Sequence, residues 1–271
     1  MQLTHILTAT PLQIILSVVS GSLVGFSLGL IGGGGSILAV PLLLYFVGYS
    51  DPHVVLGTTA LAVALTAYSN LLPHWRAGNV RWKEAGAFAV PGAMGAVVGS
   101  SIGKIVPGRQ LLFVFALMMI AVAVAMFRGW LVPAHPTQRS DRRTLARILA
   151  VSLPVGMLSG FFGIGGGFLI VPGLIFATGM PILNAIGSSL LSVGAFGTTT
   201  AIVYAISGKL NWVIAIAYFA GGVLGGRAGA ALATRLAKDR RTLTWIFSVI
   251  VMIVALYMLY INASSLGIHG V

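Results

Sequence analysis

The stretch GLIGGGGSILAVP, from Gly29 to Pro41, occurs a second time in this chain as GFFGIGGGFLIVP, from Gly160 to Pro172. Seven of the thirteen aligned residues are identical, and each stretch follows an apolar run. The glycines therefore interrupt hydrophobic sequence twice at the same relative place. This pattern predicts a chain built by internal duplication.

The duplication extends well beyond the glycine stretches. At a spacing of 130 residues, GTTAL at 57–61 aligns with GSSLL at 187–191. AGNVRW at 77–82 aligns with SGKLNW at 207–212 in the same way. Two repeats of about 130 residues therefore account for nearly the whole chain.

The composition indicates that the folded chain is surrounded by lipid. Hydrophobic residues make up 58% of the chain and charged residues only 7%. Several apolar runs exceed the roughly 18 residues that a helix needs to cross a bilayer. The predicted fold class is an all-α polytopic membrane protein.

Each repeat contains five apolar segments. They lie at about 11–31, 36–49, 53–73, 84–103 and 110–128, and at 145–162, 167–180, 183–206, 211–233 and 243–261. The second segment of each repeat has only 14 residues, or about 21 Å of helix against a hydrocarbon core of about 30 Å. These two segments are expected to be short, tilted or re-entrant helices.

The distribution of Lys and Arg predicts the topology, because basic residues favour the cytoplasmic side of short loops. With ten crossings and an external N-terminus, twelve of the sixteen basic residues fall inside. Eight crossings give a weaker asymmetry. The prediction is a first repeat at 1–130, a basic cytoplasmic linker at 131–147 and a second repeat at 148–271, all in one membrane domain with both termini periplasmic.

Five crossings per repeat is an odd number, so the second repeat is expected to be inverted in the membrane. Inverted repeats are typical of secondary transporters, whose binding site lies near the midplane where the repeats meet. Channels and scaffolds can also be duplicated, so these classes stay open. The formal charge of +12 is explained largely by orientation and does not indicate a nucleic-acid partner.

The two glycine clusters are candidate substrate sites. A helix break within the membrane is tolerated where the backbone is buried or lines a cavity. The free N–H groups at the start of the following helix, with its positive dipole end, suit an anion. Close packing is the alternative. The candidates are Gly32, Gly33, Gly34, Gly35 and Ser36 in the first cluster, and Gly163, Gly165, Gly166 and Gly167 in the second.

Polar residues inside apolar segments are further candidates, since unsatisfied polar groups are costly in hydrocarbon. Some occupy repeat-related places and bear hydroxyls that suit an oxyanion, although such hydroxyls also bond their own helix backbone. Others are cationic and suit either an anion or an interfacial position. The set is Thr58, Thr59, Ser188, Ser189, Asn70, Thr199, Thr200, His74, Arg76 and Arg227.

Several chemistries are not indicated. The chain has no cysteine, and its four carboxylates, Asp51, Glu84, Asp141 and Asp239, fall in loops or at segment ends. No catalytic constellation, metal cluster or buried carboxylate relay is recognisable. The expected protein is not an enzyme, needs no cofactor or metal, and has a small anion and the lipid bilayer as partners. A homodimer is one of the open oligomeric states.

The repeated GxxGGGxxxVP-like strings, with GTTAL and GSSLL, resemble those of the sulfite exporter TauE/SafE family of membrane permeases across essentially the full chain. The resemblance implies transport of small sulfur-containing oxyanions, such as sulfite, sulfoacetate or related organosulfonates, across the bacterial inner membrane. The implied direction is export. Because an inside-negative potential favours anion exit, export needs no coupling ion. A passive channel, an uptake permease and a non-transporting accessory protein are the alternatives.

Overall fold

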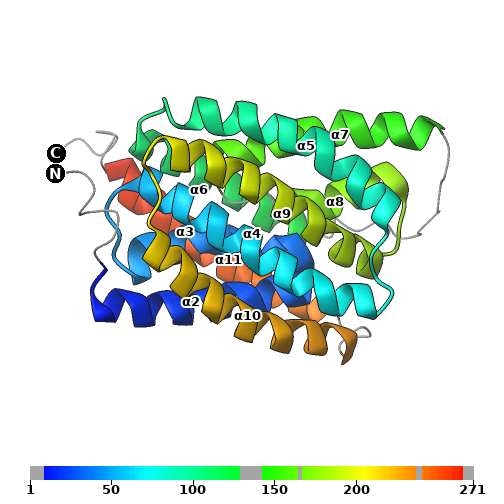
Figure 1. The fold of residues 1–271 in the computed structure, drawn as a ribbon, viewed down its shortest axis with the longest axis horizontal. Coiled ribbons are helices and arrows are strands. Elements are labelled where there is room, and N and C mark those ends of the chain that lie inside the picture. The colour runs from blue at the N-terminus through cyan, green and yellow to red at the C-terminus, as the bar shows by residue number, and fades with distance from the viewer. Residues whose placement is uncertain (1–8, 129–141, 164–166, 236–239, 265–271) are drawn as a thin grey trace.

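The computed structural model describes residues 9–128, 142–163, 167–235 and 240–264 (Figure 1). In these ranges every regular element is helical and no strand occurs. In chain order the elements are α2 (Pro11–Ile31), η1 (Gly32–Leu38), α3 (Ala39–Pro41), η2 (Leu42–Phe46), α4 (Pro52–Arg76), α5 (Trp82–Gly103), α6 (Gly108–Phe127), α7 (Arg142–Phe161), α8 (Gly167–Thr178), α9 (Ile182–Ile206), α10 (Trp212–Arg235) and α11 (Arg240–Ser264).

The all-α membrane architecture predicted from the sequence is confirmed. Within the described ranges, seven helices are long and apolar enough to cross a bilayer, the first counted through the glycine break as Pro11–Phe46. Two shorter apolar stretches, Leu169–Thr178 and Ser248–Asn262, fall below that length. Helical elements therefore occupy all ten predicted segments, and the second segment of the second repeat is short, as expected.

The first glycine cluster ends α2 and changes the type of helix that follows. Gly32 has φ 72° and ψ −148°, a conformation open mainly to glycine. Gly32–Leu38 form a 3₁₀ helix, Ala39–Pro41 an α turn and Leu42–Phe46 a π-helical turn. All residues of η1 and α3 are buried. The irregular backbone is thus enclosed by protein, as a membrane interior requires.

Helix contacts repeat between the two halves with the offset of the duplication. A Cβ atom on Gly25 of α2 would overlap the Gly222 carbonyl oxygen of α10. The equivalent residues form the same contact in the other half. Gly156 lies 131 positions after Gly25, Gly92 lies 130 positions before Gly222, and a Cβ on Gly156 of α7 would overlap the Gly92 carbonyl of α5. The glycines allow α2 to approach α10, and α7 to approach α5, at backbone contact distance.

The equivalent helices α4 and α9 run antiparallel where they meet. Gly57 of α4 faces Tyr204 near the end of α9, and Gly197 of α9 faces Ala60 further along α4. By contrast, α2 and α10 are parallel, since Gly21 faces Tyr218 and Gly29 faces Gly226. An inverted duplication would place equivalent helices in this way.

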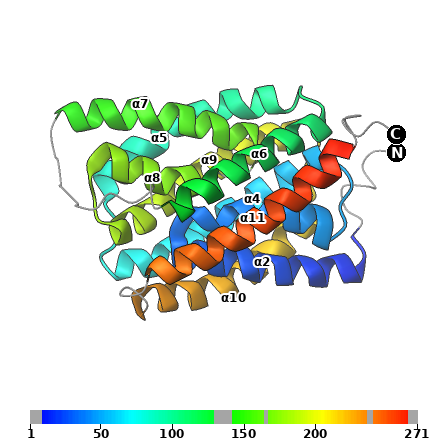
Figure 2. The ribbon, with the colours of Figure 1, turned by 180° about the vertical axis from the view of Figure 1, so that it is seen from behind.

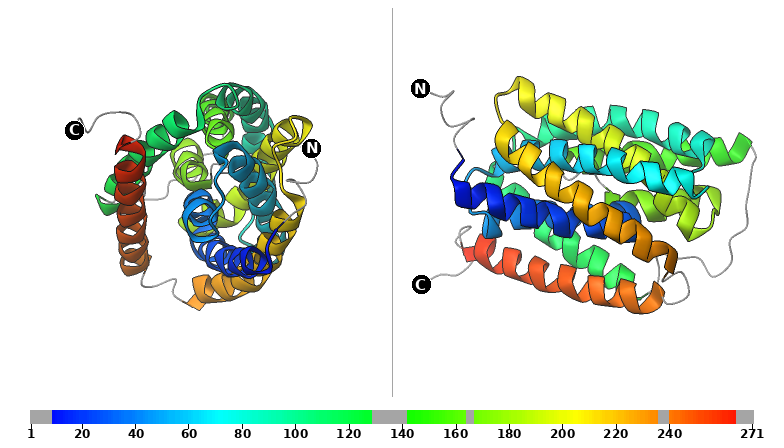
Figure 3. Two further views of the ribbon diagram at one scale, coloured as in Figure 1. Left: turned by 90° about the vertical axis from the view of Figure 1, so that its left-hand side faces the viewer. Right: turned by 60° about the horizontal axis from the view of Figure 1, so that its bottom comes forward.

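The bundle is arranged around α4 and α9 (Figure 1). The pair α2 and α10 covers one side of them, and the pair α5 and α7 covers the other. From behind, α6 and α11 lie together across the bundle (Figure 2). The start of α2 and the end of α11 lie at one end of the molecule, and the start of α7 lies at the other (Figures 1 and 3).

Tryptophans mark both ends of the bundle. Trp75 and Trp82 flank the turn 77–81, are exposed, and pack edge to face with ring centroids 5.8 Å apart. Trp212 is exposed beside the turn 207–211 at the opposite end. Because Trp is enriched at membrane–water interfaces, these turns delimit the part of the bundle that lies in the bilayer.

Candidate functional site

The break after α2 is held by a side chain of the other repeat. The Gly33 N–H donates to Ser189 Oγ of α9 at 3.2 Å, and Ser189 Oγ donates to the Ile186 carbonyl at 2.7 Å. Ser36 Oγ donates to the Gly33 carbonyl at 2.9 Å. Two of the predicted site residues, Gly33 and Ser189, are therefore in direct contact although 156 positions apart.

The second break lies at the equivalent place in the second repeat, but there the glycine faces a hydroxyl with its carbonyl and not with its N–H. Gly163 has φ 65°, and its carbonyl lies 3.4 Å from Thr59 Oγ1 of α4, whose single proton has a nearer acceptor in the Val55 carbonyl at 2.8 Å. A glycine N–H thus meets a hydroxyl at the first break, and a glycine carbonyl meets a hydroxyl at the second. Gly165 and Gly166 lie outside the described residues, and Gly167 begins α8.

A buried polar stripe runs along α4 at four-residue spacing, formed by Thr66, Asn70 and His74. Asn70 Nδ2 donates to the Gly25 carbonyl at 3.3 Å, and His74 Nε2 lies 3.0 Å from the Gly29 carbonyl. A carbonyl oxygen only accepts, so Nε2 carries the proton in this contact. Carbonyls in the last turn of a helix lack an intrahelical donor, so His74 stabilises the interrupted end of α2.

The second repeat does not reproduce this stripe. Its equivalent residues on α9 are Phe196, Thr200 and Tyr204. Thr200 is buried, and its hydroxyl has no hydrogen-bond partner among the described residues. The interface of α4 with α2 and α10 is therefore more polar than the equivalent interface of α9 with α7 and α5.

Thr58 and Ser188 tie one repeat to the other in matching ways. Thr58 Oγ1 accepts from the backbone N–H of Asn211 at 2.9 Å. Ser188 Oγ accepts from the backbone N–H of Arg81 at 2.9 Å. Each hydroxyl satisfies a donor in the turn that precedes α10 or α5. Both side chains are buried, and through these hydrogen bonds each connects one repeat to the other.

Three predicted residues lie apart from the two breaks. Thr199 is half-buried and donates to the Ala195 carbonyl of its own helix at 2.8 Å. Arg76 is exposed at the end of α4, and Arg227 is exposed on the outer face of α10. Exposure of Arg227 favours the interpretation in which its guanidinium extends toward the interface rather than into the bundle.

Arg227→Gln is therefore expected to leave anion flux within about twofold of the unmodified protein. An exposed side chain contributes little to binding at an interior site, and losing a single buried charge partner would instead cost tenfold or more. Initial flux in proteoliposomes is the measurement. A tenfold loss of flux with normal protein yield would show instead that Arg227 takes part in anion transport.

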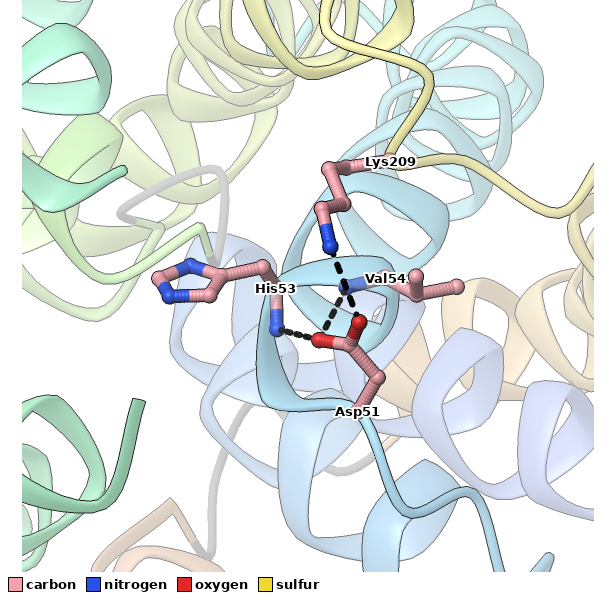
Figure 4. Close-up of polar contacts among 4 residues, drawn as sticks. All are labelled: Asp51, His53, Val54 and Lys209. Carbon is pink, nitrogen blue, oxygen red and sulfur yellow. Dashed lines mark hydrogen bonds and ion pairs between the residues drawn. The ribbon is translucent and has the colours of Figure 1, made fainter. Parts of the chain in front are cut away.

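An ion pair between the repeats was missed by sequence reasoning. Lys209 Nζ lies 3.1 Å from Asp51 Oδ2, and Asp51 Oδ1 accepts from the N–H groups of His53 and Val54 at 2.9 and 3.4 Å (Figure 4). Partial burial by itself raises the pKa of Asp51, but the hydrogen bond and charge of Lys209 and the two backbone donors outweigh it and lower the pKa. The available signal was Asp51 immediately before Pro52, which is typical of a helix N-cap.

An apolar groove of about 610 Å³ lies beside the first break. Its walls come from α2, η1, α3, η2 and α11, and include Ile31, Leu38, Pro41 and Tyr257. Mostly hydrocarbon lining offers few hydrogen-bond donors for an anion. The groove is therefore apolar, whereas the buried contacts between the glycines and the hydroxyls are polar.

Comparison with known proteins gives a consistent result over the whole bundle. The family model for sulfite exporter TauE/SafE matches residues 17–258. A probable membrane transporter protein of Xylella fastidiosa, strain Temecula1, is 49% identical over 94% of this chain and 98% of its own length. The probable membrane transporter protein YunE of Bacillus subtilis is 26% identical over 92% of this chain and 98% of its own length. No solved structure matches.

Proposed function

This chain belongs to the sulfite exporter TauE/SafE family, and we propose that it exports small sulfur-containing oxyanions such as sulfite, sulfoacetate or related organosulfonates across the bacterial inner membrane. It is a multi-pass membrane protein of a transporter family. The anion and the outward direction are the proposed part. The relatives are named only as probable membrane transporters.

The contact between Gly33 and Ser189 is the observation that supports this function best. It joins a helix break in one repeat to a hydroxyl in the other, with both groups buried. A backbone N–H and a hydroxyl can both donate hydrogen bonds to an oxyanion. The start of the next helix adds the positive end of its dipole. In the proposed cycle the anion replaces the contact between these two groups and takes both as donors.

Alternating access follows from the paired interfaces. Residues 25 and 222, and their equivalents 156 and 92, form the same backbone contact in the two halves. Rocking of one repeat against the other exchanges two similar arrangements about a fixed site. The different polarity of the α4 and α9 faces makes the two arrangements unequal, so that one repeat interface binds the anion more strongly.

Membrane potential is the proposed driving force. An inside-negative potential favours exit of an anion by about 2.3 kcal/mol per charge per 100 mV. Among the described carboxylates, Asp51 caps α4 and Glu84 lies in the first turn of α5. Neither position lies within the bundle interior where a coupling ion would bind, and export down the potential needs none.

Uptake of radiolabelled sulfite and sulfoacetate into proteoliposomes tests this function. An inside-positive potential is expected to drive saturable uptake, and Ser189→Ala is expected to reduce it about tenfold or more. That substitution leaves the buried Gly33 N–H without its acceptor, at a cost of about 1–3 kcal/mol, and about 1.4 kcal/mol corresponds to a factor of ten.

Ser100→Ala is the matched control, because Ser100 is also buried but bonds only carbonyls of its own helix. Absence of flux for both anions under either potential would refute the proposed substrates. Flux that fails to saturate would identify a channel. A strict requirement for a sodium or proton gradient would identify a coupled uptake permease instead.

A further inference from the structure

The turn 207–211, between α9 and α10, is fastened across the start of α4 (Figure 4). Lys209 Nζ forms the ion pair with Asp51 at 3.1 Å, and Asn211 Nδ2 donates to Tyr49 Oη at 2.6 Å. The Lys209 carbonyl lies against Gly57, where a Cβ would overlap it. Three separate contacts therefore hold a turn of the second repeat on the first.

The same turn covers a small apolar contact between the two central helices. Leu210 packs with Ala60 of α4 and Ala201 of α9, and all three are buried. The backbone N–H of Asn211 donates to Thr58, about two turns deeper on α4 than the ion pair. Movement of the turn away from α4 would expose this end of the α4–α9 interface.

The equivalent turn 77–81, at the opposite end, has different side chains at these positions and has Trp75 and Trp82 packed beside it. It retains the backbone bond to Ser188 and the close approach of Asn79 to Gly187. The positions that correspond to Asp51 and Lys209 are Pro181 and Asn79, and the position that corresponds to Tyr49 is Met180. These residue types cannot form the ion pair or accept the same hydrogen bond. The ion pair thus belongs to one end of the duplication alone.

We propose that Lys209 and Asp51 form the latch of an outer gate, which opens when an exiting anion competes with the Asp51 carboxylate for the Lys209 ammonium. The turn lies at the end predicted to face the periplasm. Each side chain is 43% exposed, so an anion can reach the pair. Such partly exposed pairs are weak enough to break repeatedly. The gate serves anion exit only if the chain exports anions, as proposed above.

The geometry explains why opening would leave α4 intact. Asp51 accepts from the N–H groups of His53 and Val54 through Oδ1, whereas Lys209 contacts Oδ2. Departure of Lys209 removes only the second contact, and the helix cap remains. The latch and the cap are therefore separable by mutation, because Asn at position 51 still caps a helix but carries no charge.

A cysteine reporter tests the latch directly, since the chain has no native cysteine. Ala60→Cys places a thiol under the turn at a fully buried position, and Ala201→Cys provides a second reporter if the first fails to fold. The rate of modification by a membrane-impermeant maleimide added from the outside is measured. Asp51→Asn and Lys209→Gln are each expected to raise this rate about fivefold or more, and the double variant no further.

Arg109→Gln is the charge-matched control, because Arg109 is exposed at the start of α6 at the same end. Unchanged rates in both latch variants, or an equal increase with Arg109→Gln, would overturn the latch. Added sulfoacetate, which does not react with maleimides, is expected to accelerate modification of the Ala60→Cys protein with an intact latch and to have no effect when Lys209→Gln is also present.

The labelling result is independent of transport. Faster labelling in the latch variants without measurable sulfite flux would support the latch and refute the proposed substrate. Normal flux with no labelling change would support transport and refute the latch. A sulfoacetate effect that persists with Lys209→Gln would refute competition for the ammonium while leaving the gate in place.

Discussion

Gly25→Ala and Gly156→Ala are each expected to lower the thermal midpoint of the folded protein by about 5 °C or more. A single methyl group at either position would overlap a backbone carbonyl of the facing helix, at Gly222 or Gly92 respectively. Overpacking of this kind costs about 1–3 kcal/mol, and backbone cannot move aside as a flexible side chain does. For a chain of this size, about 2–4 °C accompanies each kcal/mol.

Gly86→Ala is the matched control in the same experiment. It lies within α5 and has no neighbouring atom within 4 Å of an added Cβ. Alanine is the better helix former by about 0.5–1 kcal/mol, so this variant is expected to be unchanged or slightly stabilised. Unfolding in detergent, followed by loss of the monodisperse peak after heating, is the measurement.

Equal loss in the two crowded variants is the decisive result, because the duplication predicts matching interfaces. Destabilisation by Gly25→Ala with a neutral Gly156→Ala would show that the α5–α7 interface is more tolerant than its equivalent. Neutral behaviour of both would contradict the close helix approach described above.

Gly32→Ala and Gly163→Ala are expected to reduce sulfite flux more than tenfold while the protein still reaches the membrane. Gly32 has φ 72° and Gly163 has φ 65°, where a Cβ costs about 1–2 kcal/mol. An added Cβ at position 32 would also lie 3.0 Å from Ser189 Oγ, and at position 163 it would lie 2.6 Å from Leu56 Cβ. Both breaks would then lose the geometry proposed to hold the anion.

Gly78→Ala separates backbone strain from crowding. Gly78 also has φ 72°, yet no atom lies within 4 Å of an added Cβ. Gly78 therefore shares the positive φ of Gly32 without its crowding, although its turn contacts α9 at Gly187 and Ser188, next to Ser189. Flux through Gly78→Ala is expected to stay near the unmodified rate when normalised to inserted protein. Normal flux through both Gly32→Ala and Gly163→Ala would exclude the breaks from the pathway.

Much of the fold was predictable because hydrophobic periodicity and glycine spacing are local signals. The segment expected at 11–31 is α2 with the same limits, and the segment expected at 183–206 is α9, which begins at Ile182. The glycine break after residue 31 also lies where the sequence places it. These features depend on the length of an apolar run and on the low helix propensity of consecutive glycines.

The helix types after the break were not predictable. The sequences 36–46 and 167–177 are both strongly apolar, yet the first passes from a 3₁₀ helix through a short α turn to a π turn, whereas the second lies in one α-helix. The difference depends on long-range contacts, such as the Gly33 bond to Ser189 and the Ser36 bond to the Gly33 carbonyl. Local propensity does not report such contacts.

The site was predicted by residue type but not by pairing. The sequence placed Gly33 and Ser189 in one candidate set, and the structure brings them into contact. His74 was expected to be either an anion entry point or an interfacial helix end, and the structure buries it against the Gly29 carbonyl at the end of α2. Asp51 and Lys209 lie 158 positions apart in two loops, so no local pattern could join them.

The pairing of helices across the two halves has a consequence for biosynthesis. The glycine face of α2 contacts α10, which the ribosome completes only after about 200 further residues. Until then that face lies against lipid, because most of its packing partners have not been made. Neither half encloses its own polar backbone break, so a chain stalled after α6 would present an incompletely packed membrane segment to quality-control proteases. Completion of α10 therefore supplies the packing partner that covers the glycine face of α2.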